Sequence, residues 1–154
     1  MIESYEDLSK FLGWAERNPK IETTRQNMIR AKENFENSKE ELRFIVQRKA
    51  DNRIVGCVGL IIRNLEIPYL EIGYWVRSSE SKKGYVGMAV QLLEEYAVKE
   101  LKVKRLEIKM AESNTASTQV AKRAGFKYEA TIHSDRQLPT GKIDNTCVYY
   151  KLYS

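Results

Sequence analysis

Cysteine is scarce in this sequence, and its two cysteines lie far apart. Cys57 and Cys147 each occur within an apolar segment, and neither has a second cysteine nearby. The chain therefore has no C-x-x-C pair and no disulfide framework. We expect both thiols to be reduced and packed in the interior.

Long apolar segments and targeting signals are also lacking. The longest apolar run, from Ile54 to Ile62, is less than half of the roughly 20 residues that a membrane-spanning helix needs. The N-terminal sequence M-I-E-S-Y-E-D-L has neither the basic nor the apolar region of a signal peptide. These features predict a cytoplasmic protein with no membrane partner.

Proline and glycine contribute only three and eight residues, too few to mark a linker, and no internal repeat is present. With 42% hydrophobic and 31% charged residues, the chain can fill a core and solvate a surface, so we expect a single domain over residues 1–154. The net charge of +5 falls short of the basic density of a nucleic-acid arm, so nucleic acid is not the expected partner.

Apolar periodicity predicts two helices at the start of the chain. The first is predicted over residues 5–12, and Asn18-Pro19 ends its pattern. The second is predicted to begin with a T-x-x-Q capping box from Thr23 to Gln26. Its buried side is expected to carry Met28, Ile29, Ala31 and Phe35.

The rest of the chain alternates between strand and helix patterns. Three antiparallel strands precede an amphipathic helix and a fourth strand, an order that implies a right-handed crossover and a parallel pair. A further helix begins at Asn114 and ends at Gly125, before a last antiparallel pair. The predicted strands are 43–47, 54–62, 70–76, 106–110, 126–132 and 146–152, and the amphipathic helix is 89–101. The predicted class is α+β, with a mixed, mostly antiparallel central sheet flanked by helices.

The loop from Ser81 to Gly87 connects a strand to that amphipathic helix. It places two glycines and two lysines where free backbone N–H groups and the helix dipole favour an anion. It matches neither the G-x-x-x-x-G-K-[ST] nor the G-x-G-x-x-G pattern. A tight turn with solvated lysines explains the same residues, so spacing alone leaves phosphate binding open.

Several segments together resemble one enzyme family. They are E-I-G-Y-W-V at 71–76, S-K-K-G-Y-V-G-M-A at 81–89, L-L-E-E-Y-A at 92–97, and N-T-A-S at 114–117 followed by A-G-F-K at 124–127. In this order they resemble the GNAT superfamily of acetyl-coenzyme A-dependent N-acetyltransferases. The likeness is greatest to the Rim-type branch, which includes ribosomal-protein alanine and serine N-terminal acetyltransferases, and it runs from about Asp7 to the C-terminus.

The resemblance implies that acetyl-CoA is the cosubstrate and that no metal is needed. It places the coenzyme pyrophosphate on the loop and the first turn of the following helix, and it assigns backbone contacts with the pantetheine and the acetyl carbonyl to the end of the preceding strand. The implied loop residues are Lys82, Lys83, Gly84, Tyr85, Val86, Gly87 and Met88, and the implied strand residues are Trp75 and Val76.

The resemblance also implies catalytic roles. Glu71 lies where family members often have a carboxylate that removes the substrate ammonium proton. Asn114 lies where an asparagine of the family contacts the coenzyme near its thioester. Ser117 lies at the position from which some members protonate the departing thiolate. The residues themselves allow other interpretations: Glu71 as a solvated strand residue, and Asn114 and Ser117 as capping and first-turn residues of a helix. Trp14 resembles a tryptophan that borders the substrate cleft.

Some features depart from the family pattern. The loop has Ser81 where Arg or Gln is usual, Val86 where a small residue is usual, and Met88 where many Rim-type sequences have Glu. The family's first strand is missing, so we expect residues 43–47 to form a sheet edge. That edge predicts either a homodimer or weak aggregation, or a natural protein that starts upstream of Met1.

The predicted activity is transfer of an acetyl group from acetyl-CoA to a primary amine by direct attack in a ternary complex. A protein or peptide N-terminus, such as that of a ribosomal protein, is the expected acceptor. The alternatives are a small-molecule amine such as a polyamine or an aminoglycoside, a non-catalytic acyl-CoA-binding module and, last, a nucleic-acid-binding domain.

Overall fold

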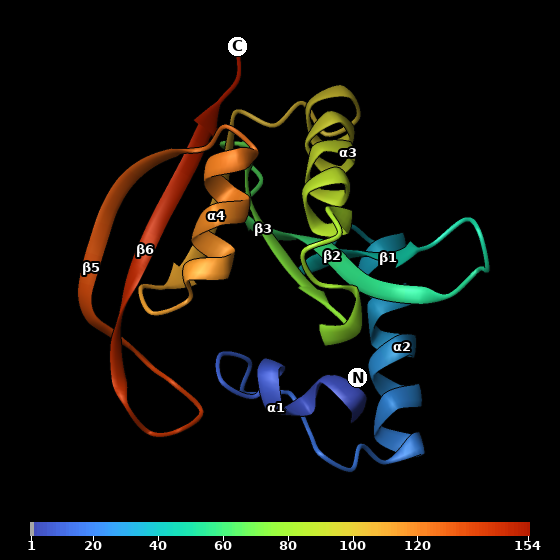
Figure 1. Ribbon diagram of the computed structural model, residues 1–154. Coiled ribbons are helices and arrows are strands. Elements are labelled where there is room, and N and C mark those ends of the chain that lie inside the picture. The colour runs from blue at the N-terminus through green and yellow to red at the C-terminus, as the bar shows by residue number, and fades with distance from the viewer. Residues whose placement is uncertain (1) are drawn as a thin grey trace.

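The computed structural model describes residues 2–154, which form a six-stranded sheet with helices (Figure 1). Two short N-terminal elements, η1 and α1, precede a long helix, α2, and the first strand. The elements are η1 (Ile2–Ser4), α1 (Tyr5–Leu8), α2 (Ile21–Glu36), β1 (Glu41–Gln47), β2 (Ile54–Asn64), β3 (Tyr69–Val76), η2 (Ser78–Glu80), α3 (Tyr85–Lys99), β4 (Arg105–Ala111), α4 (Thr115–Arg123), β5 (Lys127–Gln137) and β6 (Ile143–Leu152). No helix within residues 2–154 has the length and apolar character needed to cross a membrane.

The strands lie in the order β1-β2-β3-β4-β6-β5. Only β3 and β4 are parallel, and α3 connects them, while all other neighbours are antiparallel. The predicted mixed, mostly antiparallel sheet is therefore confirmed, as is the parallel pair on either side of the amphipathic helix.

The pairing of β3 with β4 is short. It joins only three residue pairs, of which the last is Glu71 with Glu107. Both strands continue beyond this point, β3 to Val76 and β4 to Ala111, without pairing to each other. Figure 1 shows β2 and β3 diverging from β5 and β6.

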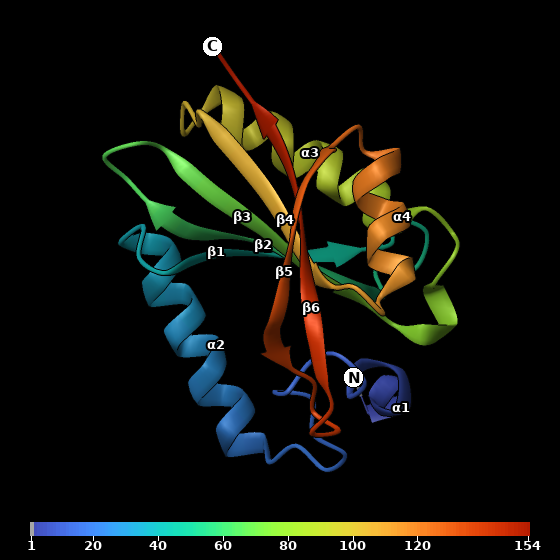
Figure 2. The same cartoon turned by 90° about the vertical axis from the view of Figure 1, so that its left-hand side faces the viewer.

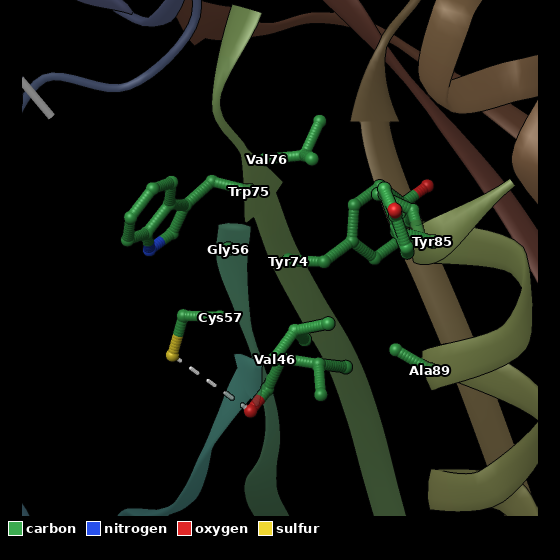
Figure 3. Close-up of a pocket in the computed structure, with 10 residues that line it drawn as sticks. Val46, Gly56, Cys57, Tyr74, Trp75, Val76, Tyr85 and Ala89 are labelled. Atoms are coloured by element: carbon green, nitrogen blue, oxygen red, sulfur yellow. Dashed lines mark hydrogen bonds between the residues drawn. The ribbon is translucent and has the colours of Figure 1, made fainter. Parts of the chain in front are cut away.

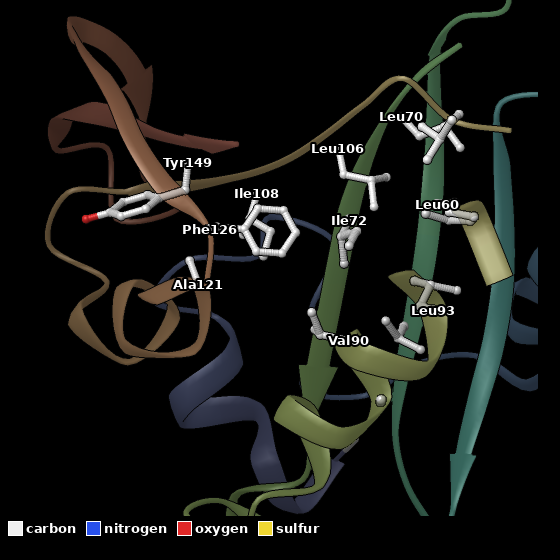
Figure 4. Close-up of a cluster of buried hydrophobic side chains, with 14 of the residues drawn as sticks. Leu60, Leu70, Ile72, Val90, Leu93, Leu106, Ile108, Ala121, Phe126 and Tyr149 are labelled. Atoms are coloured by element: carbon white, nitrogen blue, oxygen red, sulfur yellow. The ribbon is translucent and has the colours of Figure 1, made fainter. Parts of the chain in front are cut away.

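Helices α3 and α4 lie on the same face of the sheet (Figures 1 and 2). Alternate residues of the central strands point to this face, and Ile72, Leu106 and Ile108 pack there with Val90 and Leu93 of α3 (Figure 4). Burying an aliphatic side chain of this size contributes about 1.5–3 kcal/mol, so this layer fixes α3 and α4 on the sheet. Both cysteines are free and buried, as expected.

The two N-terminal helices differ from their predicted ranges. α1 ends at Leu8 instead of residue 12, because the chain continues in turns in which Phe11 and Leu12 both donate their N–H groups to the carbonyl of Leu8. α2 begins at Ile21, with Lys20 as the residue that precedes its first turn. Thr23 therefore lies inside the helix, and the predicted capping box is wrong.

The prediction of a buried side on α2 is also wrong. None of its residues is buried, and Met28 and Ile29 are 59% and 52% exposed. Phe35 touches the sheet, with its ring centroid 5.3 Å from that of Phe44 in β1. Figures 1 and 2 show the N-terminal part of α2 leading away from the sheet. Met28 and Ile29 are therefore left largely uncovered by the described residues.

The expected sheet edge is confirmed, because β1 has a neighbour on one side only. Ile45 in the middle of β1 is 54% exposed. An edge strand with unpaired backbone groups and an apolar side chain favours pairing with another chain.

This edge predicts that the 154-residue chain self-associates, and that Ile45→Lys reduces the association because a charge at the centre of an edge strand opposes pairing. Light scattering across a concentration series measures the mass. Leu92→Lys is the control, because Leu92 is also exposed, at 67%, but lies in helix α3, which offers no strand edge for pairing. A monomeric parent whose mass neither substitution changes would contradict the prediction.

Candidate active site

The loop before α3 brings the predicted pyrophosphate-binding residues together. Gly84 has φ of 84°, a left-handed conformation that glycine adopts at little cost, and it directly precedes the first turn of α3. The backbone N–H groups of Tyr85, Val86 and Gly87 belong to that first turn, where a helix has no internal acceptors for them. Met88, one residue on, donates its N–H to the carbonyl of Gly84. Three backbone N–H groups and the positive end of the helix dipole therefore point to the space in front of the N-terminus of α3.

Charges around this loop are organised by Glu80, a buried carboxylate. Glu80 accepts two hydrogen bonds of 3.1 Å from Arg48 and one of 3.0 Å from Lys83. The bond from Lys83, followed by the charge of Arg48, lowers the pKa of Glu80. Lys83 is thus already partnered, whereas Lys82 is exposed and has no ion pair within residues 2–154. The sequence did not predict the contribution of Arg48, which lies in the turn between β1 and β2 and contacts Glu80 before α3.

The backbone of β3 has a defined direction at its unpaired end. Arg77 donates its N–H to the carbonyl of Val55 in β2. Because backbone groups alternate sides along a strand, Trp75, which is paired with Cys57, also directs its N–H and C=O toward β2. Tyr74 and Val76 then direct theirs toward β4, which does not pair with them. Of the two strand residues expected to contact the coenzyme, Trp75 thus has its backbone groups directed to β2, whereas Val76 and its neighbour Tyr74 have theirs on the unpaired side.

Side chains at the end of β3 separate onto two faces (Figure 3). Tyr74 lies on the side of α3, near Tyr85 and Ala89, and Trp75 points to the opposite side. A cavity of about 10 Å³ lies between these strands and α3. It has room for about one water molecule and is too small for a coenzyme.

Trp75 meets Trp14 on the face away from α3. Their ring centroids are 6.3 Å apart in an edge-to-face arrangement, and Trp14 is exposed. The segment after α1 thus brings Trp14 to the end of β3.

Asn114 and Ser117 lie at the start of α4. Asn114 Oδ1 accepts a hydrogen bond of 3.1 Å from the backbone N–H of Ser117, so the capping interpretation is confirmed. The hydroxyls of Ser117 and Tyr74 are 2.7 Å apart, although the two residues belong to α4 and β3. Burial raises the pKa of Tyr74 to about 12. Sequence analysis named Ser117 but missed its partner Tyr74.

Glu71 lies at the last pair of the β3–β4 ladder and is 9% exposed, so it is not a solvated strand residue. Its Oε2 accepts hydrogen bonds of 3.0 and 2.8 Å from Arg63, and Lys109 Nζ lies 3.8 Å from the same oxygen. Oε1 has no hydrogen-bond partner among the described residues. Arg63 therefore holds one of the two carboxylate oxygens of Glu71. Within residues 2–154 no group of three or more His, Cys, Asp or Glu is arranged to hold a metal ion.

Comparison with known proteins identifies relatives of this chain. A family model described as an acetyltransferase (GNAT) domain matches residues 2–127. The probable N-acetyltransferase YjcK of Bacillus subtilis (strain 168) is 34% identical over 112 residues, which cover 71% of this chain and 60% of the relative. The chain therefore spans less than two thirds of that relative's length.

Two solved structures share the fold. MccE, a microcin C7 self-immunity acetyltransferase in complex with acetyl-CoA and AMP, has a TM-score of 0.87 at 24% identity, over 97% of this chain and 81% of that chain. RimL, a ribosomal L7/L12 alpha-N-protein acetyltransferase in complex with coenzyme A, has a TM-score of 0.88 at 21% identity, and the match covers 98% of this chain and 83% of that chain. At these identities the likeness shows the fold alone.

The charges at the loop predict that replacing both Lys82 and Lys83 with Ala weakens acetyl-CoA binding about tenfold, since an exposed charge beside an anion contributes roughly 0.2–1 kcal/mol and the first-turn amides remain. Lys82→Ala is expected to have the larger single effect, because Lys83 is partnered by Glu80. Calorimetry measures the affinity, with Lys99→Ala at the far end of α3 as control. Unchanged affinity in the double variant would remove both lysines from the site.

Proposed function

Since the chain belongs to the acetyltransferase (GNAT) family, we propose that it transfers the acetyl group of acetyl-CoA to a primary amine. The observation that carries this proposal is the part of β3 that continues beyond the last β3–β4 pair, at Glu71 and Glu107, and lies beside the first turn of α3. An unpaired strand edge and a helix N-terminus together provide polar backbone groups for an amide-containing, phosphate-bearing ligand.

Binding of acetyl-CoA is assigned mainly to backbone groups. The amides of Tyr85, Val86 and Gly87 and the charge of Lys82 suit the pyrophosphate. The backbone groups of Tyr74 and Val76 that face β4 suit the pantetheine amides and the acetyl carbonyl. When the amine attacks this carbonyl, an N–H group from this edge stabilises the negative charge that develops on its oxygen. Because backbone groups make these contacts, the unusual Ser81 and Val86 are compatible with binding.

Glu71 is assigned as the base that takes a proton from the acceptor ammonium, directly or through water, on its unoccupied Oε1. Arg63 and Lys109 hold Oε2 and so fix the carboxylate in place. Asn114 is assigned to the coenzyme near its thioester through its side-chain amide nitrogen, since its Oδ1 caps α4. Ser117 is assigned as the proton donor to the departing sulfur.

The proposed acceptor is a protein or peptide N-terminus. Trp14 and Trp75 form an aromatic surface beside the end of β3 that suits an extended peptide segment. A polyamine calls for a strongly acidic cleft, whereas the carboxylate of Glu71 is already paired with Arg63 and approached by Lys109. RimL, which shares the fold, is described as an alpha-N-protein acetyltransferase.

A screen of thiol release from acetyl-CoA tests this function. Peptides that begin with Ser, Ala or Met are compared with polyamines and aminoglycosides, and we expect release with at least one peptide and a higher kcat/KM than with any small amine. Faster turnover of a small amine would overturn the peptide assignment. Binding of acetyl-CoA without release for any acceptor would favour a non-catalytic module.

The assignment of Glu71 predicts that Glu71→Gln lowers kcat about tenfold or more near neutral pH, because the amide cannot accept the proton. Affinity for acetyl-CoA should remain within about twofold, since the side chain acts on the amine. Steady-state kinetics and calorimetry measure the two quantities. Parent-like turnover in the variant would assign the proton to water or to another group.

A further inference from the structure

Tyr74 makes a side-chain contact across the two diverging halves of the sheet. It extends from β3 and reaches the first turn of α4, which follows β4. Its hydroxyl oxygen lies 2.7 Å from Ser117 Oγ and 3.2 Å from the carbonyl oxygen of Ser117. Figure 3 shows its ring on the helix side of β3. Two residues separated by 43 positions are thus joined where the backbone pairing has ended.

The hydrogen-bonding capacity of this pair limits what it can do. Tyr74 has one proton, and it can donate that proton either to Ser117 Oγ or to the Ser117 carbonyl. In the first case the proton of the Ser117 hydroxyl remains free to be donated elsewhere. In the second case Ser117 uses its proton on the Tyr74 oxygen. Burial raises the pKa of Tyr74 to about 12, so Tyr74 remains a donor throughout the neutral range.

Ser117 is held at two points. Asn114 accepts its backbone N–H and so fixes the main chain at the start of α4. A serine side chain still has three staggered rotamers, and the Tyr74 hydroxyl selects among them by binding Oγ. The backbone of Ser117 is therefore positioned by α4 and its hydroxyl by β3.

We propose that Tyr74 is a positioning residue that donates to Ser117 Oγ and thereby leaves the Ser117 proton for the sulfur of the departing coenzyme. This inference rests on the proposed acetyl transfer and adds a residue to it. Tyr74 acts through Ser117 and keeps its own proton.

The proton balance of the step is complete without another reactant. The neutral amine forms a bond to the acetyl carbon, and the carbon–sulfur bond breaks with its electron pair on sulfur. The extra proton on the new amide nitrogen passes to Ser117 Oγ as the Ser117 proton passes to sulfur. The products are the N-acetyl amide and the free thiol, and Ser117 and Tyr74 end in their starting protonation states. Ser117 Oγ can accept from both Tyr74 and the nitrogen, because a hydroxyl oxygen has two lone pairs.

The experiment compares Tyr74→Phe, Ser117→Ala and the double variant. We expect each single variant to lower kcat about tenfold, with KM and calorimetric affinity for acetyl-CoA within about twofold of the parent. The double variant should be no slower than Ser117→Ala, because Tyr74 has nothing to position once the Ser117 hydroxyl is removed. If the two substitutions acted only through lost packing, the losses in kcat of the two single variants would instead add in the double variant.

Tyr153→Phe is the matched control. Its hydroxyl donates a hydrogen bond of 2.8 Å to Glu94 at a part-buried position, so the variant also loses one tyrosine hydrogen bond, but outside the assigned site. The melting temperature of Tyr153→Phe should fall about as much as that of Tyr74→Phe, but the kcat of Tyr153→Phe should equal that of the parent. If Tyr74→Phe is too unstable to assay, Ser117→Ala with parent-like kcat still overturns the proposal.

Three results would overturn the inference while leaving the proposed function intact: parent-like kcat in Tyr74→Phe, additive losses in the double variant, or a loss carried by coenzyme affinity instead of kcat. Absence of acetyl transfer by the parent with every acceptor would instead remove the proposed function and, with it, this inference. The two failures are therefore distinguishable.

Discussion

The early end of the β3–β4 ladder is the constraint on which the rest of the site depends. Pairing stops at Glu71 and Glu107, although both strands continue. Beyond that point Tyr74 and Val76 direct backbone groups toward β4 with no strand partner there. An unpaired buried polar group costs about 1–3 kcal/mol, so such an edge persists where water or a ligand supplies the missing partner. A ligand with amide and carbonyl groups of its own can take the place of the absent strand pairs.

The same divergence sets where the helices begin. α3 follows β3 and α4 follows β4, so both helix N-termini lie near the separating strand ends (Figure 1). The α3 end offers amides and Lys82 to an anion, and the α4 end offers Ser117 beside Tyr74. Glu71 and the Trp14–Trp75 pair lie on the opposite face, to which we assign the approach of the amine. In the proposed function, acetyl-CoA therefore binds on one face of β3 and the amine arrives from the other.

Much of this arrangement could be predicted from the sequence, because it depends on local periodicity. The amphipathic pattern of residues 89–101 and the alternation in 70–76 and 106–110 correspond to α3, β3 and β4. The exposed apolar side of α2 could not be predicted, since amphipathicity shows which side prefers burial but not whether anything covers it. The Tyr74–Ser117 and Arg48–Glu80 contacts join distant positions that no spacing rule connects. The direction of the Trp75 amide could not be predicted either, because it depends on the register with β2, which only the structure supplies.

Amide hydrogen exchange measured by NMR at Tyr74, Trp75 and Val76 tests the central claim, that acetyl-CoA completes the unpaired edge of β3. Because Trp75 is paired with Cys57 and its two neighbours face away from β2, the three consecutive amides should respond in alternation. Addition of acetyl-CoA should slow exchange about tenfold or more at Tyr74 and Val76 and leave Trp75 within about twofold of its starting rate. Equal slowing at all three amides, or no change at Tyr74 and Val76 under saturating acetyl-CoA, would contradict the account.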